Sequence, residues 1–158
     1  MSFHYYKGEK LFDESLMKLR KEIGSKRIMC TEFGMTSYVS SILPFGHTEN
    51  EQAIYVQQIV NQLDIAEIDY FIWNLYDYPS IDANIFGKKP WIISAQKEMG
   101  LIDQSGKRKK VVSVLLNEDH HVRVFEDVLK PYILVYLFIF LVMLIIGFLL
   151  RKHFLSSR

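Results

Sequence analysis

The sequence predicts an α/β fold built from three strand-helix units and followed by one membrane-spanning helix. Short apolar runs of extended character alternate with segments whose apolar residues recur at helical spacing, which is the order of βα units. From Tyr132 to Leu150 the chain carries no charge, and at about 1.5 Å per residue that stretch crosses most of a hydrocarbon core. The length of 158 residues is enough for one domain ahead of such a helix.

The first predicted unit joins an extended aromatic segment to an amphipathic helix. Residues 2–6 form the strand, and residues 13–23 form the helix. One face of this helix carries Leu16, Leu19, Arg20 and Ile23. Gly24 follows directly, and a glycine at this position predicts the end of the helix.

The second predicted strand, residues 27–33, ends in an acid and a glycine. Ile28, Cys30 and Glu32 share one face of an extended chain by the period-2 rule. An acid that ends an apolar face is placed where catalytic groups of parallel barrels lie, at the C-terminal end of a strand. Cys30 is the single cysteine, so no disulfide forms within the chain, and we expect a small buried hydrophobe rather than a nucleophile.

The remaining soluble part contains a second long helix and a third strand. Thr48 and Glu51 form a capping box that predicts a helix start, and residues 68–75 form the strand. The apolar face of the helix consists of Ala53, Val56, Val60 and Leu63. We expect an irregular stretch over residues 76–99, a polar turn over 100–106, and a last short helix that begins near Lys109.

The apolar segment predicts a single-pass membrane protein. Pro131 suits the first turn of its helix, and Tyr132 and Tyr136 suit the interface. Its upstream flank, residues 123–130, mixes both signs of charge. The downstream flank is basic, which favours a cytoplasmic C-terminus and an extracellular globular part. The basic residues are Arg151, Lys152 and Arg158. The predicted regions are therefore a globular part (1–116), a juxtamembrane linker (117–130), a transmembrane helix in the lipid bilayer (131–150) and a cytoplasmic tail (151–158).

Composition argues against several kinds of ligand. With 19 basic and 18 acidic residues, the chain has no electrostatic footprint for nucleic acid, and we expect no nucleic-acid partner. His120 and His121 are adjacent, so they do not face one ligand position on a helix or a strand, and we interpret them as a solvated pair. We expect neither a metal nor a cofactor.

Three short motifs lie in order at the ends of the three predicted strands. They are His4-Tyr5-Tyr6, Thr31-Glu32-Phe33-Gly34 and Trp73. With the closing turn Gly100-Leu-Ile-Asp followed by Ser105-Gly106-Lys107, they make residues 1–116 similar to the last three βα units of a cellulase-type glycoside hydrolase. The resemblance is to family 5 and its clan A relatives, which are TIM (β/α)8 barrels.

This resemblance implies a retaining glycosidase that acts on a β-linked polysaccharide or glycan. Glu32 matches the nucleophile, His4 and Tyr6 match a strand-end pair that holds the nucleophile ionised and aimed, and Trp73 matches the aromatic floor beneath the sugar. In the family the acid/base comes from an Asn-Glu pair on an earlier strand. The resemblance therefore implies that the rest of the barrel lies upstream of Met1 and that this chain alone is inactive.

Two other interpretations remain open from the sequence. The chain could be a tail-anchored, non-catalytic interaction or sugar-binding protein whose N-terminal part stays in the cytosol, because residues 1–10 lack the apolar core of a secretory signal. It could also be a product without function. The sugar, its linkage and the choice between endo and exo cleavage are not indicated by these residues.

Overall fold

A parallel three-stranded sheet forms the centre of the globular part. The computed structural model describes residues 1–8, 11–116 and 130–156. Strands β1 (Ser2–Tyr5), β2 (Met29–Phe33) and β3 (Asp69–Ile72) pair in the order β1-β2-β3. The pairs Tyr5 with Phe33 and Phe33 with Ile72 align their last residues. All three strands therefore end at one edge of the sheet.

The three predicted strands exist, and each is shorter than predicted. β2 begins at Met29 rather than at position 27, and β3 ends at Ile72 rather than at position 75. At the start of β2, the amino group of Met1 donates to the Arg27 carbonyl and the Met29 amide donates to Met1. The backbone of Arg27 thus contacts the chain end, while its side chain pairs with Asp69 at the start of β3. The length of each strand is limited by the strand beside it, because pairing needs a partner residue as well as an extended segment.

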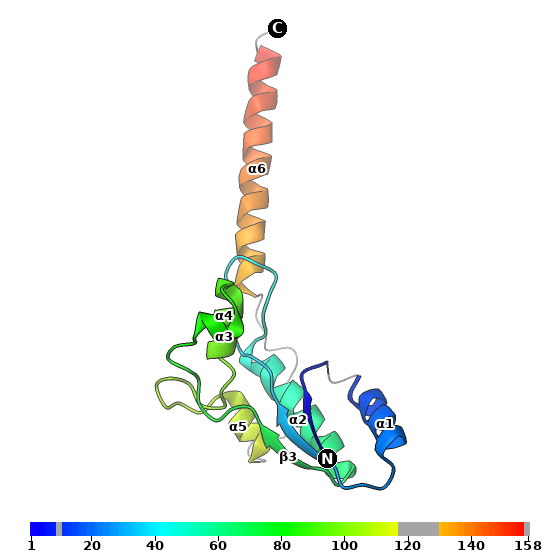
Figure 1. Ribbon diagram of the computed structural model, residues 1–158. Helices are drawn as coiled ribbons and strands as arrows, with labels where there is room; N and C mark the ends of the chain where they lie inside the picture. The colour runs from blue at the N-terminus through cyan, green and yellow to red at the C-terminus, as the bar shows by residue number, and fades with distance from the viewer. Residues whose placement is uncertain (9–10, 117–129, 157–158) are drawn as a thin grey trace.

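Helices α1 (Phe12–Ile23) and α2 (Glu49–Ile65) connect the three strands in turn, and α5 (Lys110–Leu115) packs against α2 (Figure 1). The predicted caps are confirmed. Thr48 and Glu51 form the complete capping box of α2, and α1 ends at Gly24, whose φ of 67° lies in the left-handed region that glycine adopts without strain.

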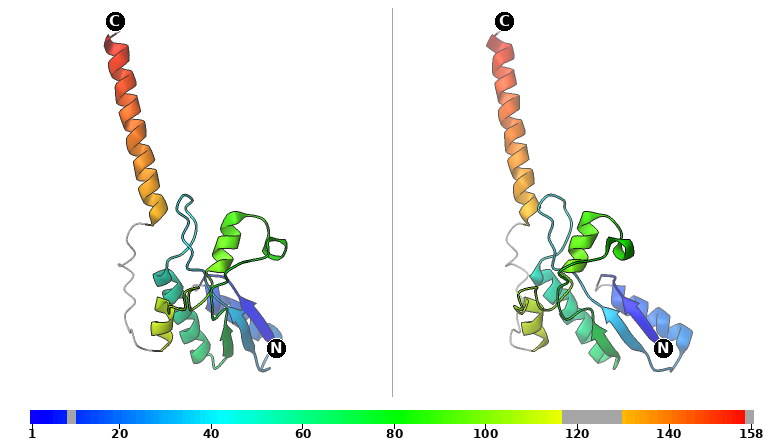
Figure 2. Two further views of the ribbon diagram at one scale, coloured as in Figure 1. Left: turned by 90° about the vertical axis from the view of Figure 1, so that its left-hand side faces the viewer. Right: turned by 60° about the vertical axis from the view of Figure 1, so that its left-hand side comes forward.

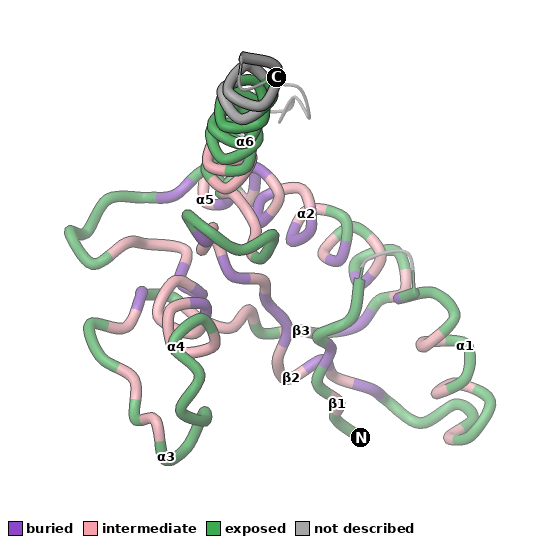
Figure 3. The backbone as a smooth tube through the Cα atoms, turned by 90° about the horizontal axis from the view of Figure 1, so that it is seen from above, coloured by how far each residue is buried: buried purple, intermediate pink, exposed green. Residues whose placement is uncertain are grey.

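The hydrophobic core lies between the sheet and these helices (Figure 3). Cys30 and Phe33 of β2 are fully buried and belong to this core, as do Ile59 of α2 and Val111 of α5. Cys30 is therefore the small buried residue that the sequence predicts. Burial raises the pKa of its thiol to about 11, so the thiol stays protonated and unreactive near neutral pH.

The expectation of an irregular stretch over residues 76–99 is wrong. Two short helices form there, α3 (Ala83–Phe86) and α4 (Pro90–Lys97). Their start signals are local: the Asp82 side chain accepts a bond from the Asn84 amide, and Pro90 occupies the first turn of α4. The polar turn at 103–106 and the short helix after Lys109 are confirmed.

One described helix, α6 (Pro131–Ser156), is long and apolar enough to span a membrane. It begins at Pro131 as predicted and continues past position 150, so part of the predicted tail is helical. No part of its apolar window is buried, and Figure 1 shows it projecting away from the α/β part. His120, His121, Arg158 and all of the linker except Lys130 lie outside the described residues.

Candidate active site

Glu32 lies at the edge of the sheet where the strands end, and two side chains from β1 and its extension contact its carboxylate. The backbone register sets His4 opposite Glu32 on the neighbouring strand. His4 Nδ1 lies 3.5 Å from Glu32 Oε2, and the Tyr6 hydroxyl donates to Oε1. Parallel pairing of β1 and β2 therefore brings together the three residues that the sequence placed at strand ends.

The Tyr6 hydroxyl stays protonated and can therefore always donate a hydrogen bond. Burial and the hydrogen bond to Glu32 together raise the pKa of Tyr6 far above its ordinary value. The phenol therefore stays protonated at every physiological pH and donates its proton to the hydrogen bond with Glu32. About a quarter of the Glu32 side chain is exposed, so the carboxylate is held by Tyr6 and is still reachable from solvent.

A cleft of about 660 Å³ opens beside Glu32. This volume lies within the range of small-ligand sites. Its aromatic and apolar lining residues include Tyr6, Met35, Tyr55, Trp73, Phe86 and Met99, and its polar ones include Lys7, Glu32, Thr36, His47 and Gln96. Glu32 is the one carboxylate among the described residues of this cleft. A cleft that combines aromatic rings with a few polar groups suits a sugar, whose C–H faces stack on rings while its hydroxyls form hydrogen bonds.

Trp73 lies next to the C-terminal end of β2, the strand that carries Glu32. It follows β3 directly, its amide donates to the Phe33 carbonyl at 2.7 Å, and a cis peptide bond joins it to Asn74. A Cβ on Gly34 would overlap the Trp73 carbonyl oxygen. Gly34 is therefore required by the close approach of the two backbones, and this approach brings Trp73 to the cleft that Glu32 lines.

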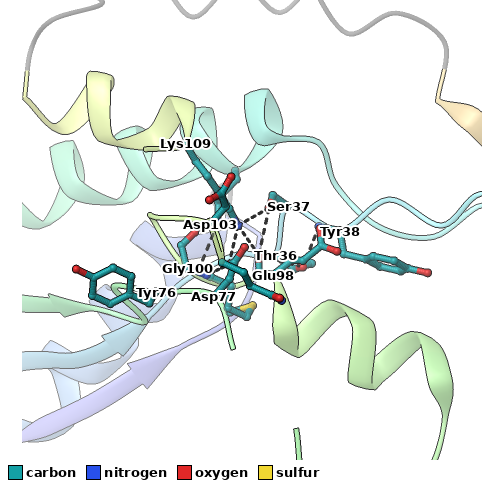
Figure 4. Close-up of polar contacts among 12 residues, drawn as sticks. Thr36, Ser37, Tyr38, Tyr76, Asp77, Glu98, Gly100, Asp103 and Lys109 are labelled. Atoms are coloured by element: carbon teal, nitrogen blue, oxygen red, sulfur yellow. Dashed lines mark hydrogen bonds and ion pairs between the residues drawn. The ribbon is translucent and has the colours of Figure 1, made fainter. Parts of the chain in front are cut away.

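A buried ion pair holds loop residues that are sequence neighbours of Thr36 and Met99 in the cleft lining (Figure 4). Lys109 Nζ lies 2.7 Å from Asp77 Oδ1, and the side chains of Lys109 and Asp77 are only 4% and 5% exposed. The same ammonium donates to Ser37 Oγ and to the Glu98 carbonyl, while Asp77 accepts from the Gly100 amide. The pair thus joins the loops that follow β2 and β3 to the start of α5.

Sequence reasoning missed this pair. Lys109 lies in a run of basic residues, Lys107-Arg-Lys-Lys110, that looks like a solvated surface, and Asp77 stands in a stretch that was expected to be irregular. The one available signal was the position of Lys109 at the N-terminus of the predicted last helix, next to the turn. Among the described residues, no cluster of three or more His, Cys, Asp or Glu side chains could hold a metal ion.

Comparisons with known proteins support a glycosidase-like fold. No protein-family model matches the chain, and no curated protein matches it by sequence. Among solved structures, a GH2 β-galacturonidase from Eisenbergiella tayi matches with a TM-score of 0.57 and 19% identity, over 73% of this chain and 22% of that one. A β-D-glucuronidase from Dictyoglomus thermophilum matches with a TM-score of 0.55 and 21% identity, over 74% of this chain and 22% of that one.

An endo-laminarinase from Formosa matches with a TM-score of 0.50 and 23% identity, over 66% of this chain and 26% of that one. The chain has a glycoside hydrolase-like fold, and it spans about a quarter of the length of these structures. At such low identity the likeness concerns the fold alone. Membership of family 5 and closure into a (β/α)8 barrel stay predictions, since three parallel strands are described.

Proposed function

We propose that this chain forms the C-terminal part of the catalytic domain of a membrane-anchored retaining glycoside hydrolase, which acts on a β-linked polysaccharide or glycan. The observation that carries the proposal is the Glu32 carboxylate, held by Tyr6 and His4 at the strand ends and facing a cleft that Trp73 also lines. The glycoside hydrolase-like fold supports it, because a carboxylate at a strand end is where this kind of enzyme needs one.

Each residue has a distinct role in the proposed reaction. A Glu32 oxygen attacks the anomeric carbon, the bond to the leaving-group oxygen breaks, and a glycosyl ester forms on Glu32, which water then hydrolyses. Tyr6 and His4 position the carboxylate for this attack. Trp73 stacks beneath the sugar and supplies binding area at little entropic cost.

The proposal requires a second carboxylic acid that protonates the leaving group. Retaining enzymes hold it about 5 Å from the nucleophile, and the described residues of the cleft include no acid besides Glu32. We propose that further strands contribute it. In the described part of the chain β1 and β3 each pair on one side only, and open sheet edges of this kind are sites where other strands pair.

α6 is the proposed anchor. Its exposed apolar surface is suited to lipid, and the basic residues that follow its apolar stretch favour a cytoplasmic C-terminus. The alternative function is a non-catalytic sugar-binding membrane protein. Among the described residues the cleft has one carboxylate, which favours this alternative, because stacking on Trp73 needs no acid.

Covalent trapping by a dinitrophenyl fluoroglycoside tests the proposal. Dinitrophenolate departs without a proton, so the reaction needs the nucleophile and hardly needs the acid. We expect mass spectrometry of the detergent-solubilised chain to find one glycosyl group on the peptide that contains Glu32. Glu32→Gln should abolish the label, Trp73→Ala should slow labelling mainly by weakening binding, and Glu22→Gln on exposed α1 should leave it unchanged. An unactivated polysaccharide should not be turned over by any of these forms.

Two results would overturn the assignment. A glycosyl group on another acid would show that Glu32 is not the nucleophile. Sugar binding that depends on Trp73 but not on Glu32, without any covalent label, would support the non-catalytic sugar-binding protein instead.

A further inference from the structure

A loop between β2 and α2 presents three large apolar side chains at its tip. We call residues 40–46 the tip loop; within it Ile42, Leu43 and Phe45 are 64%, 43% and 38% exposed. No charged side chain lies between Glu32 and Glu49 if His47 is left aside. Exposed apolar residues that occur singly are ordinary on a protein surface, but adjacent ones at a projecting tip indicate an interaction site.

The tip loop has a defined shape. Val39 and Gly46 form an antiparallel bridge at its base, and the Ser40 amide donates to the Phe45 carbonyl at 3.0 Å. The Ser40 hydroxyl accepts bonds from the amides of Ile42 and Leu43. The amides of Ser40, Ile42, Leu43 and Phe45 thus find acceptors within the tip loop, which lowers the cost of moving them out of water.

The base of the tip loop is joined to the start of α6. Lys130, the residue before Pro131, donates to the Gly46 carbonyl at 3.3 Å and pairs with Glu51 Oε1 at 2.8 Å. Both views of Figure 2, like Figure 1, show the loop beside the first turn of α6 and rising along it. The tip therefore reaches at least as far toward the apolar end of the molecule as the first turn of α6.

From these observations we infer that the tip loop inserts into the bilayer leaflet that receives the first turn of α6, where Ile42, Leu43 and Phe45 contact lipid at the boundary of headgroups and acyl chains. The inference rests on the proposed anchor, because it needs α6 to enter a membrane. We infer contact with the bilayer rather than with a protein, because the tip loop lies beside an apolar helix that no described residue covers.

Docking of the tip loop would also place the cleft close to the membrane surface. Thr36 and His47, one from each limb of the segment that carries the tip, both line the cleft. Two contacts with the bilayer, α6 and the tip, would restrict rotation of the globular part about α6. The cleft would then face sugars close to the bilayer, such as those of glycolipids or of membrane-proximal glycans.

Quenching by spin-labelled lipids tests the inference. An environment-sensitive fluorophore is attached in turn at Leu43→Cys, Ile65→Cys and Leu141→Cys of the full chain in phosphatidylcholine vesicles, with spin labels near the headgroup or deep in the acyl chains. Ile65 is the matched control, since it is apolar and exposed but ends α2, about 25 Å along that helix from the end that follows the tip loop. Buried Cys30, with its raised pKa, does not compete for the label, and the chain without an added cysteine provides the blank.

We expect shallow spin labels to quench position 43 several-fold more than position 65, and deep ones to quench position 141. Equal quenching at positions 43 and 65 together with deep quenching at 141 would overturn the docking of the tip loop and leave the anchor intact. Absence of quenching at 141 would overturn the anchor and the inference with it. Ile42→Cys provides a second reporter of the tip if Leu43→Cys disturbs the loop.

Discussion

At the scale of single residues, the Asp77–Lys109 pair is the most consequential polar contact of the globular part. Both charges are buried, and removal of one leaves the other without its counter-charge in a low-dielectric site, which typically costs about 3 to 5 kcal/mol. We therefore predict that Lys109→Met lowers the free energy of unfolding by an amount of that order. Urea unfolding of the detergent-solubilised chain, followed by circular dichroism, measures it.

Two comparisons control this experiment. Lys88→Met changes an exposed lysine and should alter stability little. The double variant Asp77→Asn with Lys109→Met leaves no buried charge and should be more stable than Lys109→Met alone. A double variant that loses as much stability as the single one would show that packing of the Lys109 side chain matters and that its charge does not.

Sequence patterns could predict some of these side-chain contacts but not others. His4, Tyr6 and Glu32 could be placed together because strand ends of a parallel sheet meet at one edge, and a register that pairs His4 with Glu32 is enough to bring them into contact. Asp77 and Lys109 could not, because they lie 32 positions apart in the sequence and outside regular strands. No local periodicity relates two such residues.

At the scale of elements, the start of α2 depends on a charge as well as on a cap. Burial would raise the pKa of Glu51, but hydrogen bonds from Lys130 and from the Thr48 amide outweigh burial and lower it. A lowered pKa means that this contribution to stability is present above the unfolded-state pKa of about 4.3 and is lost as pH falls through the folded-state value.

We therefore predict that Glu51→Gln destabilises the chain at pH 7 and that the difference from the unchanged chain disappears at acidic pH. Glutamine can still cap the amide of Thr48 but cannot pair with Lys130 by charge. Thr48→Ala should lower the free energy of unfolding by about 1 kcal/mol at either pH, because its hydroxyl does not titrate. Unfolding curves recorded from neutral to acidic pH distinguish the two, and Ser41→Ala in the exposed loop is the control.

Elements with strong local signals were the predictable ones. The capping box and Gly24 after α1 satisfy backbone groups within a few residues, and Pro131 at α6 has no amide hydrogen that needs a partner, so the sequence alone indicates them. α3 and α4 are only 4 and 8 residues long, too short to show a repeated apolar face. Whether these two helices form depends on their packing against the rest of the fold, and the sequence does not reveal that packing.

At the scale of the whole molecule, the order of strands and helices follows from the sequence, but the surroundings of the sheet do not. Alternation of apolar segments predicts βα units, and helical crossovers between successive strands make neighbouring strands parallel. Nothing in that pattern fixes what pairs with β1 and β3 on their other sides, since edge and central strands of a parallel sheet carry similar apolar residues. The proposed role of the tip loop could likewise not be predicted, because it depends on the position of the loop beside α6.

Orientation in the membrane is the whole-molecule property that separates the two proposed functions. A glycosidase acting on external sugars needs its globular part outside, whereas a tail-anchored protein keeps it in the cytosol. Positive residues close to a span resist translocation, so Arg151 and Lys152 should hold the C-terminus in the cytoplasm. Protease added to intact cells should therefore digest the Glu32 region and spare a tag placed after Arg158. Replacement of Arg151 and Lys152 by glutamine should increase the fraction of reversed molecules, whereas Lys21→Gln on exposed α1 should not. Digestion of the tag together with protection of the Glu32 region would show the opposite orientation, and the cytosolic sugar-binding protein would then be the better account.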